Sequence, residues 1–169
     1  MDVFETVSTI LAVRAFQPTP ISSEQVQRIL ESGRLTGSGS NQQPWHFIVV
    51  DEPAELQKLA ELAKSGPYIA QAPVAIVVVV DRSPLAVSDG SRAIQSMILT
   101  AWSEGIGSNW VGYVGMKGVN EFLNIPDNLD VLAILPFGYP VKQLGQGKKK
   151  RKALSEVASH GKYGNLSSG

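Results

Sequence analysis

Few side chains in this sequence could catalyse a reaction directly. The two histidines, His46 and His160, lie far apart and outside any HExxH-type spacing, so they do not predict a metal site. The absence of cysteine excludes thiol catalysis, zinc–thiolate centres and iron–sulfur clusters. The carboxylates are scattered, and no GxSxG elbow, GxxxxGK(S/T) loop or strand-linked GxGxxG occurs. If the protein is an enzyme, its difficult chemistry must therefore come from a cofactor.

Three groups of residues could hold such a cofactor. The loop TGSGSNQQPW, residues 36–45, carries hydroxyl and amide groups that can contact a ligand: Ser38, Ser40, Asn41 and Gln43. Arg14 stands near Phe16 at the expected end of a helix, where a cation also interacts favourably with the helix dipole. A basic run, Lys148 to Lys152, could neutralise a phosphate.

The basic run is the main feature of the charge distribution. It holds five of the 15 Lys and Arg residues, so the rest of the chain is acidic although the net charge is zero. One concentrated positive segment on an acidic body predicts a local anion partner. Two other interpretations stay open, a solvated loop without a ligand and a localisation signal.

Length and composition limit the kind of protein that this sequence can encode. The length of 169 residues, with 43% hydrophobic and 18% charged, predicts one globular domain over 1–164 and a flexible tail over 165–169. The acidic body argues against nucleic-acid binding. The longest apolar run, 72–80, is far shorter than the roughly 20 residues of a membrane helix. The acidic start argues against a secretory signal, and the lack of cysteine fits a cytoplasmic protein.

The elements that must position these groups follow from hydrophobic periodicity. The pattern predicts an irregular α/β or α+β alternation in one domain. Ser22 and Gln25 have capping-box spacing, and Gly105 and Gly107 should stop a long helix. The expected helices cover 2–13, 22–33, 52–64, 89–104 and 119–123; the expected strands cover 46–50, 74–81, 108–114 and 131–137, with a last strand or turn at 154–157.

Taken together and in order, several stretches resemble the FMN-dependent nitroreductase family. The Asn-x-Gln-Pro-Trp core and the Gly-x-Gly-Ser-x-Trp segment are specific in combination, and the similarity spans nearly the whole chain. The similar stretches are VRAF (13–16), SGSNQQPWHFIVV (38–50), APVAIVVV (72–79), DGSRAIQSMILTAWSEGIGSNWVG (89–112), LPFGYP (135–140) and KKKRKALSEV (148–157).

The resemblance implies an α+β fold with a central, mostly antiparallel sheet flanked by helices, and a homodimer with two FMN sites at its interface. In that family pattern Arg14 corresponds to the basic residue at the N1/O2 edge of the flavin, where its charge stabilises the anionic reduced form. The backbone at Gly112 and Tyr113 corresponds to the segment that faces flavin N5.

The same resemblance implies roles for the loop and for the basic run. Ser38, Ser40 and Asn41 correspond to a loop that the partner subunit contributes to the FMN site. Lys149 and Arg151 correspond to the clamp on the FMN phosphate, which makes that phosphate the expected anion.

Two positions depart from the family pattern, which reads Arg-x-Ser-x-Arg/Lys before the Phe. Here Ile10 replaces the first Arg and Ala12 replaces the Ser. A lost charged hydrogen bond costs about 1.5–3 kcal/mol, so FMN should bind more weakly unless the basic run compensates. The connection over 81–92 is also short and predicts a substrate cleft that is open or is completed by other loops.

The resulting prediction is a ping-pong oxidoreductase in which NADH or NADPH reduces FMN and a small electron acceptor, such as a nitroaromatic or a quinone, then takes its place. One alternative is a flavin-binding module with little turnover, which Ile10 and Ala12 favour. Another is an FMN enzyme of different chemistry, such as reductive dehalogenation or flavin cleavage.

Overall fold

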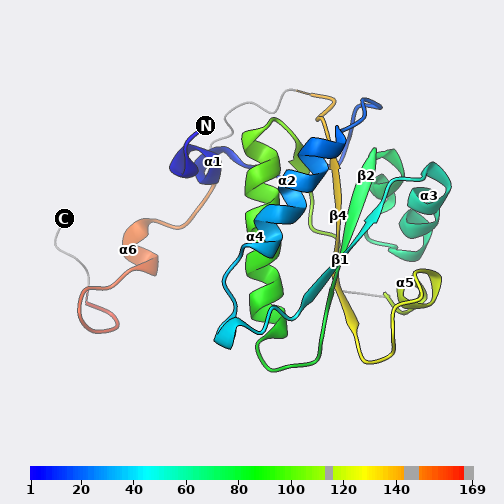
Figure 1. The fold of residues 1–169 in the computed structure, drawn as a ribbon. Coiled ribbons are helices and arrows are strands. Elements are labelled where there is room, and N and C mark those ends of the chain that lie inside the picture. The colour runs from blue at the N-terminus through cyan, green and yellow to red at the C-terminus, as the bar shows by residue number, and fades with distance from the viewer. Residues whose placement is uncertain (113–115, 143–148, 166–169) are drawn as a thin grey trace.

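A computed structural model describes residues 1–112, 116–142 and 149–165. Its strands are β1 (Trp45–Val50), β2 (Val74–Val80), β3 (Gly107–Ser108) and β4 (Asp130–Gly138). They form one sheet in the order β1-β2-β4-β3, and every pair of neighbours is antiparallel. Helices pack on both faces (Figure 1), so the expected α+β fold with an antiparallel sheet is confirmed.

The helices match most of the expected ones with small shifts at their ends. They are α1 (Val3–Thr9), α2 (Ser23–Arg34), α3 (Pro53–Leu62), α4 (Ala86–Ser103), α5 (Lys117–Phe122) and α6 (Leu154–Val157), with 3-10 turns η1 (Gly39–Asn41) and η2 (Pro67–Gln71). Helix α4 begins three residues before its expected start. Only residues 81–85 therefore connect it to β2.

Strand β2 is the centre of the core. All seven of its residues are buried, and it pairs with β1 on one side and β4 on the other. Alternate side chains of β2 point to opposite faces of the sheet, and each face is covered by helices. Ile76 packs with α2 and α4 against Ile94 and Met97, whereas Val77 packs with α3 against Leu59. The continuous run of β-branched residues is typical of a strand that is covered on both faces.

Helix α1 is shorter than expected. The predicted helix over 2–13 was wrong beyond Thr9, because the chain then becomes extended and pairs with the region of β3. The Val13 amide donates to the Ser108 carbonyl at 2.9 Å, a tertiary bond that helical geometry would not allow. Val3 and Val7, apolar residues at helical spacing, are also not buried, since they are 78% and 47% exposed.

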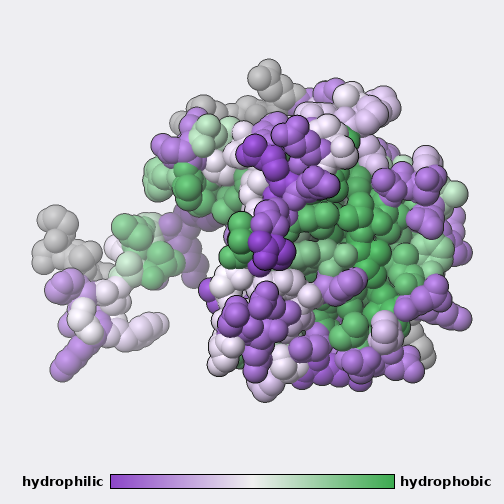
Figure 2. Space-filling model, in the orientation of Figure 1, coloured by the Kyte–Doolittle hydropathy of each residue, from purple (hydrophilic) through white to green (hydrophobic). Residues whose placement is uncertain are grey.

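The last described segment leaves the body of the protein. Residues 150–165 are all exposed and extend away from the sheet on the side of α1 (Figure 1). The expected strand or turn at 154–157 is the short helix α6, which begins with Glu156 accepting from the Ala153 amide. Figure 2 shows apolar surface on this arm and on α1.

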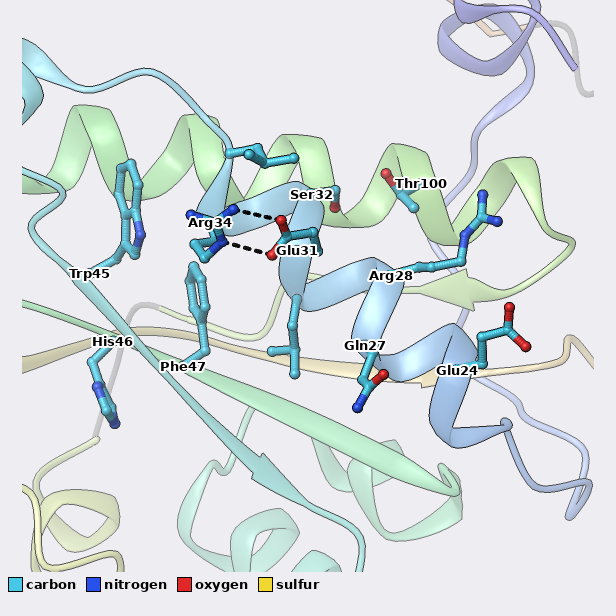
Figure 3. Close-up of a pocket in the computed structure, with 12 residues that line it drawn as sticks. Glu24, Gln27, Arg28, Glu31, Ser32, Arg34, Trp45, His46, Phe47 and Thr100 are labelled. Atoms are coloured by element: carbon cyan, nitrogen blue, oxygen red, sulfur yellow. Dashed lines mark hydrogen bonds and ion pairs between the residues drawn. The ribbon is translucent and has the colours of Figure 1, made fainter.

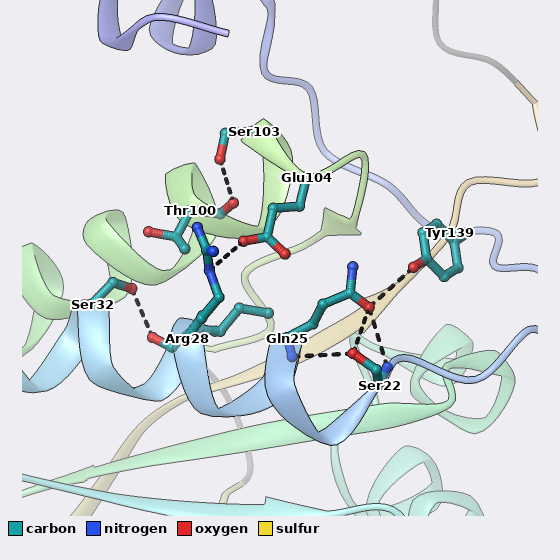
Figure 4. A network of polar contacts seen from close by, with 9 residues as sticks. Ser22, Gln25, Arg28, Ser32, Thr100, Ser103, Glu104 and Tyr139 are labelled. Atoms are coloured by element: carbon teal, nitrogen blue, oxygen red, sulfur yellow. Dashed lines mark hydrogen bonds and ion pairs between the residues drawn. The ribbon is translucent and has the colours of Figure 1, made fainter.

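Helix α2 is fastened at its beginning by a polar network (Figure 4). The Ser22 hydroxyl accepts from the Gln25 amide, and the Gln25 side chain accepts from the Ser22 amide, so the expected capping box is confirmed. The Tyr139 hydroxyl, just after β4, donates to the same Gln25 oxygen at 3.2 Å. The cap therefore also ties α2 to the sheet.

Replacing Ser22 with Ala should lower the free energy of unfolding by about 1 kcal/mol, because α2 loses its N-cap acceptor. Urea denaturation of both proteins measures this change. Ser23→Ala is the matched control, since Ser23 is exposed and makes no side-chain hydrogen bond to any described residue. The control should change stability by no more than about 0.5 kcal/mol. Equal losses in the two variants would contradict the capping role.

Candidate functional site

An open groove of about 930 Å³ lies between the end of α1, the C-terminal half of α4 and the segment that follows β3. Its lining joins residues from both ends of the chain: Val7, Ser8, Thr9, Ile10, Leu11, Ala12, Gln95, Ile98, Ser108, Asn109, Trp110, Lys149 and Arg151. A volume of this size suits a cofactor or a small ligand.

The wall formed by residues 9–13 is held by contacts with α4 and β3. The Trp102 indole donates to the Thr9 hydroxyl at 3.0 Å, and Ala12 bridges to Ser108. Gly107 allows this close approach, because a Cβ there would lie 2.3 Å from Val13 Cγ2. The wall is therefore set by tertiary contacts and not by α1 itself.

Lys149 and Arg151 supply the positive charge of the groove. The Lys149 ammonium donates to the Val7 carbonyl at 2.6 Å, and the Arg151 guanidinium donates to the Lys150 carbonyl at 2.9 Å. Each group has further N–H donors for an anion. Desolvation lowers the pKa of Lys149, and the nearby charge of Arg151 lowers it further. The predicted pair is thus brought together, whereas Lys150 and Lys152 do not line the groove and Lys148 lies outside the described residues.

The rest of the groove is largely apolar beside these two cations. Ile10 and Ala12 both line it, so apolar side chains occupy the two positions where the family pattern has an arginine and a serine. Lys149 and Arg151 are the only cations in the described lining. An anion bound here would depend on that pair.

Sequence reasoning missed Asn109 as a groove residue. Asn109 is buried, lines the groove and donates to the Tyr68 hydroxyl from η2. The available signal was the polar pair Ser108-Asn109 between apolar residues, just after a helix-stopping glycine. Gln95 of α4 also lines the groove.

Arg14 does not join this cluster. It is exposed on the extended segment and is absent from the groove lining. Its expected second role as a cation at the end of α1 was wrong, because α1 ends five residues earlier at Thr9. Lys149 takes that role instead, since its ammonium contacts a carbonyl in the last turn of α1.

Gly112 lies close to the groove through Trp110. A Cβ at Gly112 would be 2.7 Å from Trp110 Nε1 and 3.1 Å from the Leu132 carbonyl, so a side chain would not fit without movement. Trp110 is 42% exposed and lines the groove, so it is not a core residue. Tyr113, the other residue expected to face flavin N5, lies outside the described residues.

Trp110 also borders a second hollow of about 550 Å³, beside Arg82 and Asp130. These two side chains form a double contact at 3.0 Å, and the arginine holds the pKa of the Asp130 carboxyl below its usual range. Because the two charges neutralise each other, this hollow is less suited to an anionic ligand than the groove.

The loop from Ser38 to Gln43 has an unusual backbone. Ser40, Asn41 and Gln43 have φ values of 49°, 54° and 50°, a region that non-glycine residues seldom adopt. The Ser38 hydroxyl accepts from the Gln43 amide at 2.9 Å and closes the turn. None of the loop residues lines the groove.

Helix α4 separates the loop from the groove. Its residues 89, 92 and 96, together with the N-cap residue Leu85, follow helical spacing along one stripe and contact residues 36–39. Gln95 and Ile98 belong to a different stripe and line the groove. One chain therefore places its loop and its cations on different flanks of the same helix.

Another hollow, of about 880 Å³, lies between α2 and β1 (Figure 3). Its cations are already paired: Arg34 makes two contacts with Glu31, at 2.7 and 2.6 Å, and Arg28 contacts Glu104 at 2.8 Å. None of the residues expected to bind the cofactor lines it. We therefore take the groove that holds Lys149 and Arg151 as the candidate site.

Within residues 1–112, 116–142 and 149–165, no group of three or more His, Cys, Asp or Glu residues could hold a metal ion. No described helix is long and apolar enough to cross a membrane.

Comparison with known proteins identifies a family. The model of the Nitroreductase family matches residues 11–86 and 66–139. A provisionally named NADH dehydrogenase/NAD(P)H nitroreductase of Methanothermobacter thermautotrophicus is 32% identical over 154 residues, covering 86% of this chain and 81% of the relative.

Solved structures agree with this match. A nitroreductase family protein of Clostridium difficile superposes with a TM-score of 0.83 at 29% identity, covering 96% of this chain and 99% of that one. The NADPH:FMN oxidoreductase of Vibrio harveyi, complexed with NAD+, gives a TM-score of 0.84 at 25% identity, covering 97% and 79%.

Proposed function

The chain belongs to the nitroreductase family, and from this we propose that it is an FMN-dependent oxidoreductase that takes electrons from NADH or NADPH. The acceptor would be a small molecule such as a nitroaromatic or a quinone. One observation carries the proposal: Lys149 and Arg151 meet in a groove beside the segments that match the family. The similarity to an NADPH:FMN oxidoreductase supports the choice of cofactor and donor.

The groove has the chemical features that FMN requires. Two cations with available donors stand together and suit a phosphate. Apolar residues beside them, including Ile98 and Leu11, suit the less polar part of the cofactor, and Gln95 and Asn109 offer amides for its hydroxyl groups. The residues present therefore fit the group.

Bound FMN would supply two-electron hydride chemistry between the donor and the acceptor, in alternation. The protein's own contribution is binding, orientation and electrostatics. Lys149 and Arg151 would hold the phosphate. The role of Arg14 at the reduced ring stays a prediction from the family pattern, because Arg14 does not line the groove. The backbone at Gly112 and Tyr113 would face the reactive edge. No protein acid or base is required, since solvent can supply protons.

We further propose that the working form is a homodimer with two sites at the interface. Ser38, Ser40, Asn41 and Gln43 would serve the groove of the partner subunit, because α4 separates them from their own groove. The exposed apolar residues of the arm and of α1 support this assembly. They are Leu154 at 78%, Val157 at 64% and Phe4 at 82% exposure.

A second candidate is a flavin-binding module without appreciable turnover. The observation that favours it is the apolar lining at Ile10 and Ala12, which removes two phosphate contacts of the family pattern. The two candidates differ in NAD(P)H oxidation and not in flavin uptake.

The first experiment is a visible absorption spectrum of the purified protein before and after incubation with FMN and removal of free flavin. The proposal expects oxidised-flavin bands at about one FMN per chain, followed by NADH or NADPH oxidation when a quinone is added. A protein that takes up no flavin would overturn the proposal. Flavin uptake without oxidation of either nucleotide would favour the second candidate.

Replacing Lys149 and Arg151 together with Ala should weaken FMN binding at least about tenfold, because the phosphate loses its charged donors. Fluorescence titration with FMN measures the dissociation constant. Riboflavin, which has no phosphate, should lose much less affinity in the same variant.

The control is the double variant Lys150→Ala/Lys152→Ala. It removes the same charge from neighbouring exposed positions that do not line the groove. Its FMN affinity should stay close to that of the unaltered protein. Equal losses in both double variants would show a general charge effect in place of a phosphate clamp.

Restoring the family pattern should strengthen FMN binding. The variant Ile10→Arg/Ala12→Ser adds one cation and one hydroxyl to the lining, and a charged hydrogen bond contributes about 1.5–3 kcal/mol, roughly ten- to a hundredfold in affinity. The same titration measures this gain. Unchanged affinity would mean that residues 10 and 12 lie outside the reach of the phosphate.

A further inference from the structure

Asp89 is the one ionisable side chain that is buried among the described residues, with 2% exposure. A buried carboxylate is costly unless charge and hydrogen bonds compensate for its lost hydration. Asp89 lies in the first turn of α4, outside the groove and on a different stripe of the helix. Its burial therefore calls for a role that the groove does not explain.

The two carboxylate oxygens of Asp89 have different partners. The Gly39 amide donates to Oδ2 at 2.9 Å, and the Arg92 guanidinium contacts Oδ1 at 3.2 Å. Arg92 is itself exposed to solvent, so it serves as counter-charge at the rim. The buried oxygen is thus directed at the backbone of the loop.

Gly39 begins the 3-10 turn η1, at the point where the loop enters its unusual conformation. Ser40 and Asn41 follow it directly with positive φ. Non-glycine residues keep such angles only when surrounding contacts hold them. The bond from Gly39 to Asp89 is a fixed point for the turn.

The N-cap residue of α4 and a later residue of the helix hold the chain on either side of this bond. A Cβ at Gly39 would lie 2.4 Å from Leu85 Cδ1, so Leu85 packs directly on the glycine. The Thr36 hydroxyl donates to the Ser96 hydroxyl at 2.8 Å two turns further along the helix. Of these contacts, only the Asp89 bond holds the backbone of the turn through a charge.

We propose that Asp89 is a positioning residue for the FMN site of the partner subunit. It holds Gly39, and so presents Ser40 and Asn41 in the conformation that contacts the cofactor across the dimer interface. The inference rests on the proposed function, because that function places this loop in the partner's site. It adds a residue that touches no cofactor and that controls the affinity of a site in the other chain.

The direct test compares Asp89→Ala with Asp89→Asn in the full-length protein. Asp89→Ala should weaken FMN binding about tenfold, as expected for loss of one charged hydrogen bond. Asp89→Asn keeps an acceptor oxygen of the same shape and should recover most of that affinity. Unchanged FMN affinity in Asp89→Ala, or equal losses in both variants, would overturn the proposal.

Ser96→Ala is the control in the same stripe. It removes the contact with Thr36 but leaves the Asp89–Gly39 bond in place. Its FMN affinity should equal that of the unaltered protein. A loss as large as that of Asp89→Ala would show that any loosening of the loop has the same effect, and would overturn the specific role of Asp89.

Amide exchange in the unaltered protein without FMN gives a readout that needs neither activity nor a variant. The Gly39 amide should exchange at least about tenfold more slowly than the Ser40 amide, since a buried carboxylate accepts from it. This measurement tests the bond between Asp89 and the Gly39 amide even if Asp89→Ala does not fold. Equal exchange of the two amides would overturn the proposal.

Mixed dimers test whether the effect crosses the interface. A chain with Asp89→Ala is paired with a Lys149→Ala/Arg151→Ala chain that carries a second affinity tag, and the mixed dimer is purified. One of its two sites then combines an intact groove with an intact loop from the other chain. It should bind half the FMN of the unaltered dimer at the original affinity; no recovery would overturn the assignment to the partner's site.

The outcomes separate this inference from the proposed function. If the unaltered protein takes up no FMN, the proposed function fails and the inference fails with it. If the unaltered protein binds FMN and Asp89→Ala binds it equally well, only the inference fails.

Discussion

The packing of α4 against the sheet is the contact on which the rest of the structure depends. The buried stripe of this helix, including Ala93, Ile94 and Met97, lies against β2 and its neighbours. The two other sides of α4 then face in fixed directions. One holds the loop at Gly39 and the other forms a wall of the groove. A helix that served only to cover the core would not need a buried carboxylate.

The groove shows how a cation is positioned by a distant part of the chain. Lys149 contacts the last turn of α1, which has no basic residue of its own. The partial negative charge of that helix end attracts the cation and places it beside Ile10 and Ala12. The same hydrogen bond holds the beginning of the exposed arm against the body. It therefore sets both the position of the cation in the groove and the position of the arm.

One chain alone does not bring together all the residues proposed to contact the cofactor. The cations and the polar loop stand on different flanks of α4, and much of the apolar surface of α1 and of the arm is exposed. Figure 2 shows a further apolar patch along β1, between α2 and α3. Exposed apolar area of this kind is typical of surfaces that become covered in an assembly. The proposed homodimer would join the separated contacts and cover this surface by the same association.

The sequence by itself determined the features that depend on local chemistry. The β-branched run predicted β2, Ser22 and Gln25 predicted the cap of α2, and the helix α4 was found within three residues of its start. The concentration of Lys and Arg predicted the cations of the groove. Each of these follows from neighbouring residues, because periodicity, capping and charge density are properties of short segments.

Only the tertiary structure decided where α1 ends and that Arg14 does not line the groove. Periodicity favoured a helix to Val13, but the bond from Val13 to Ser108 joins residues 95 positions apart, and no local pattern contains it. The separation of the loop from the groove was decided in the same way. Long-range hydrogen bonds and the direction of helix faces depend on the packed fold, and so they override local preference at these places.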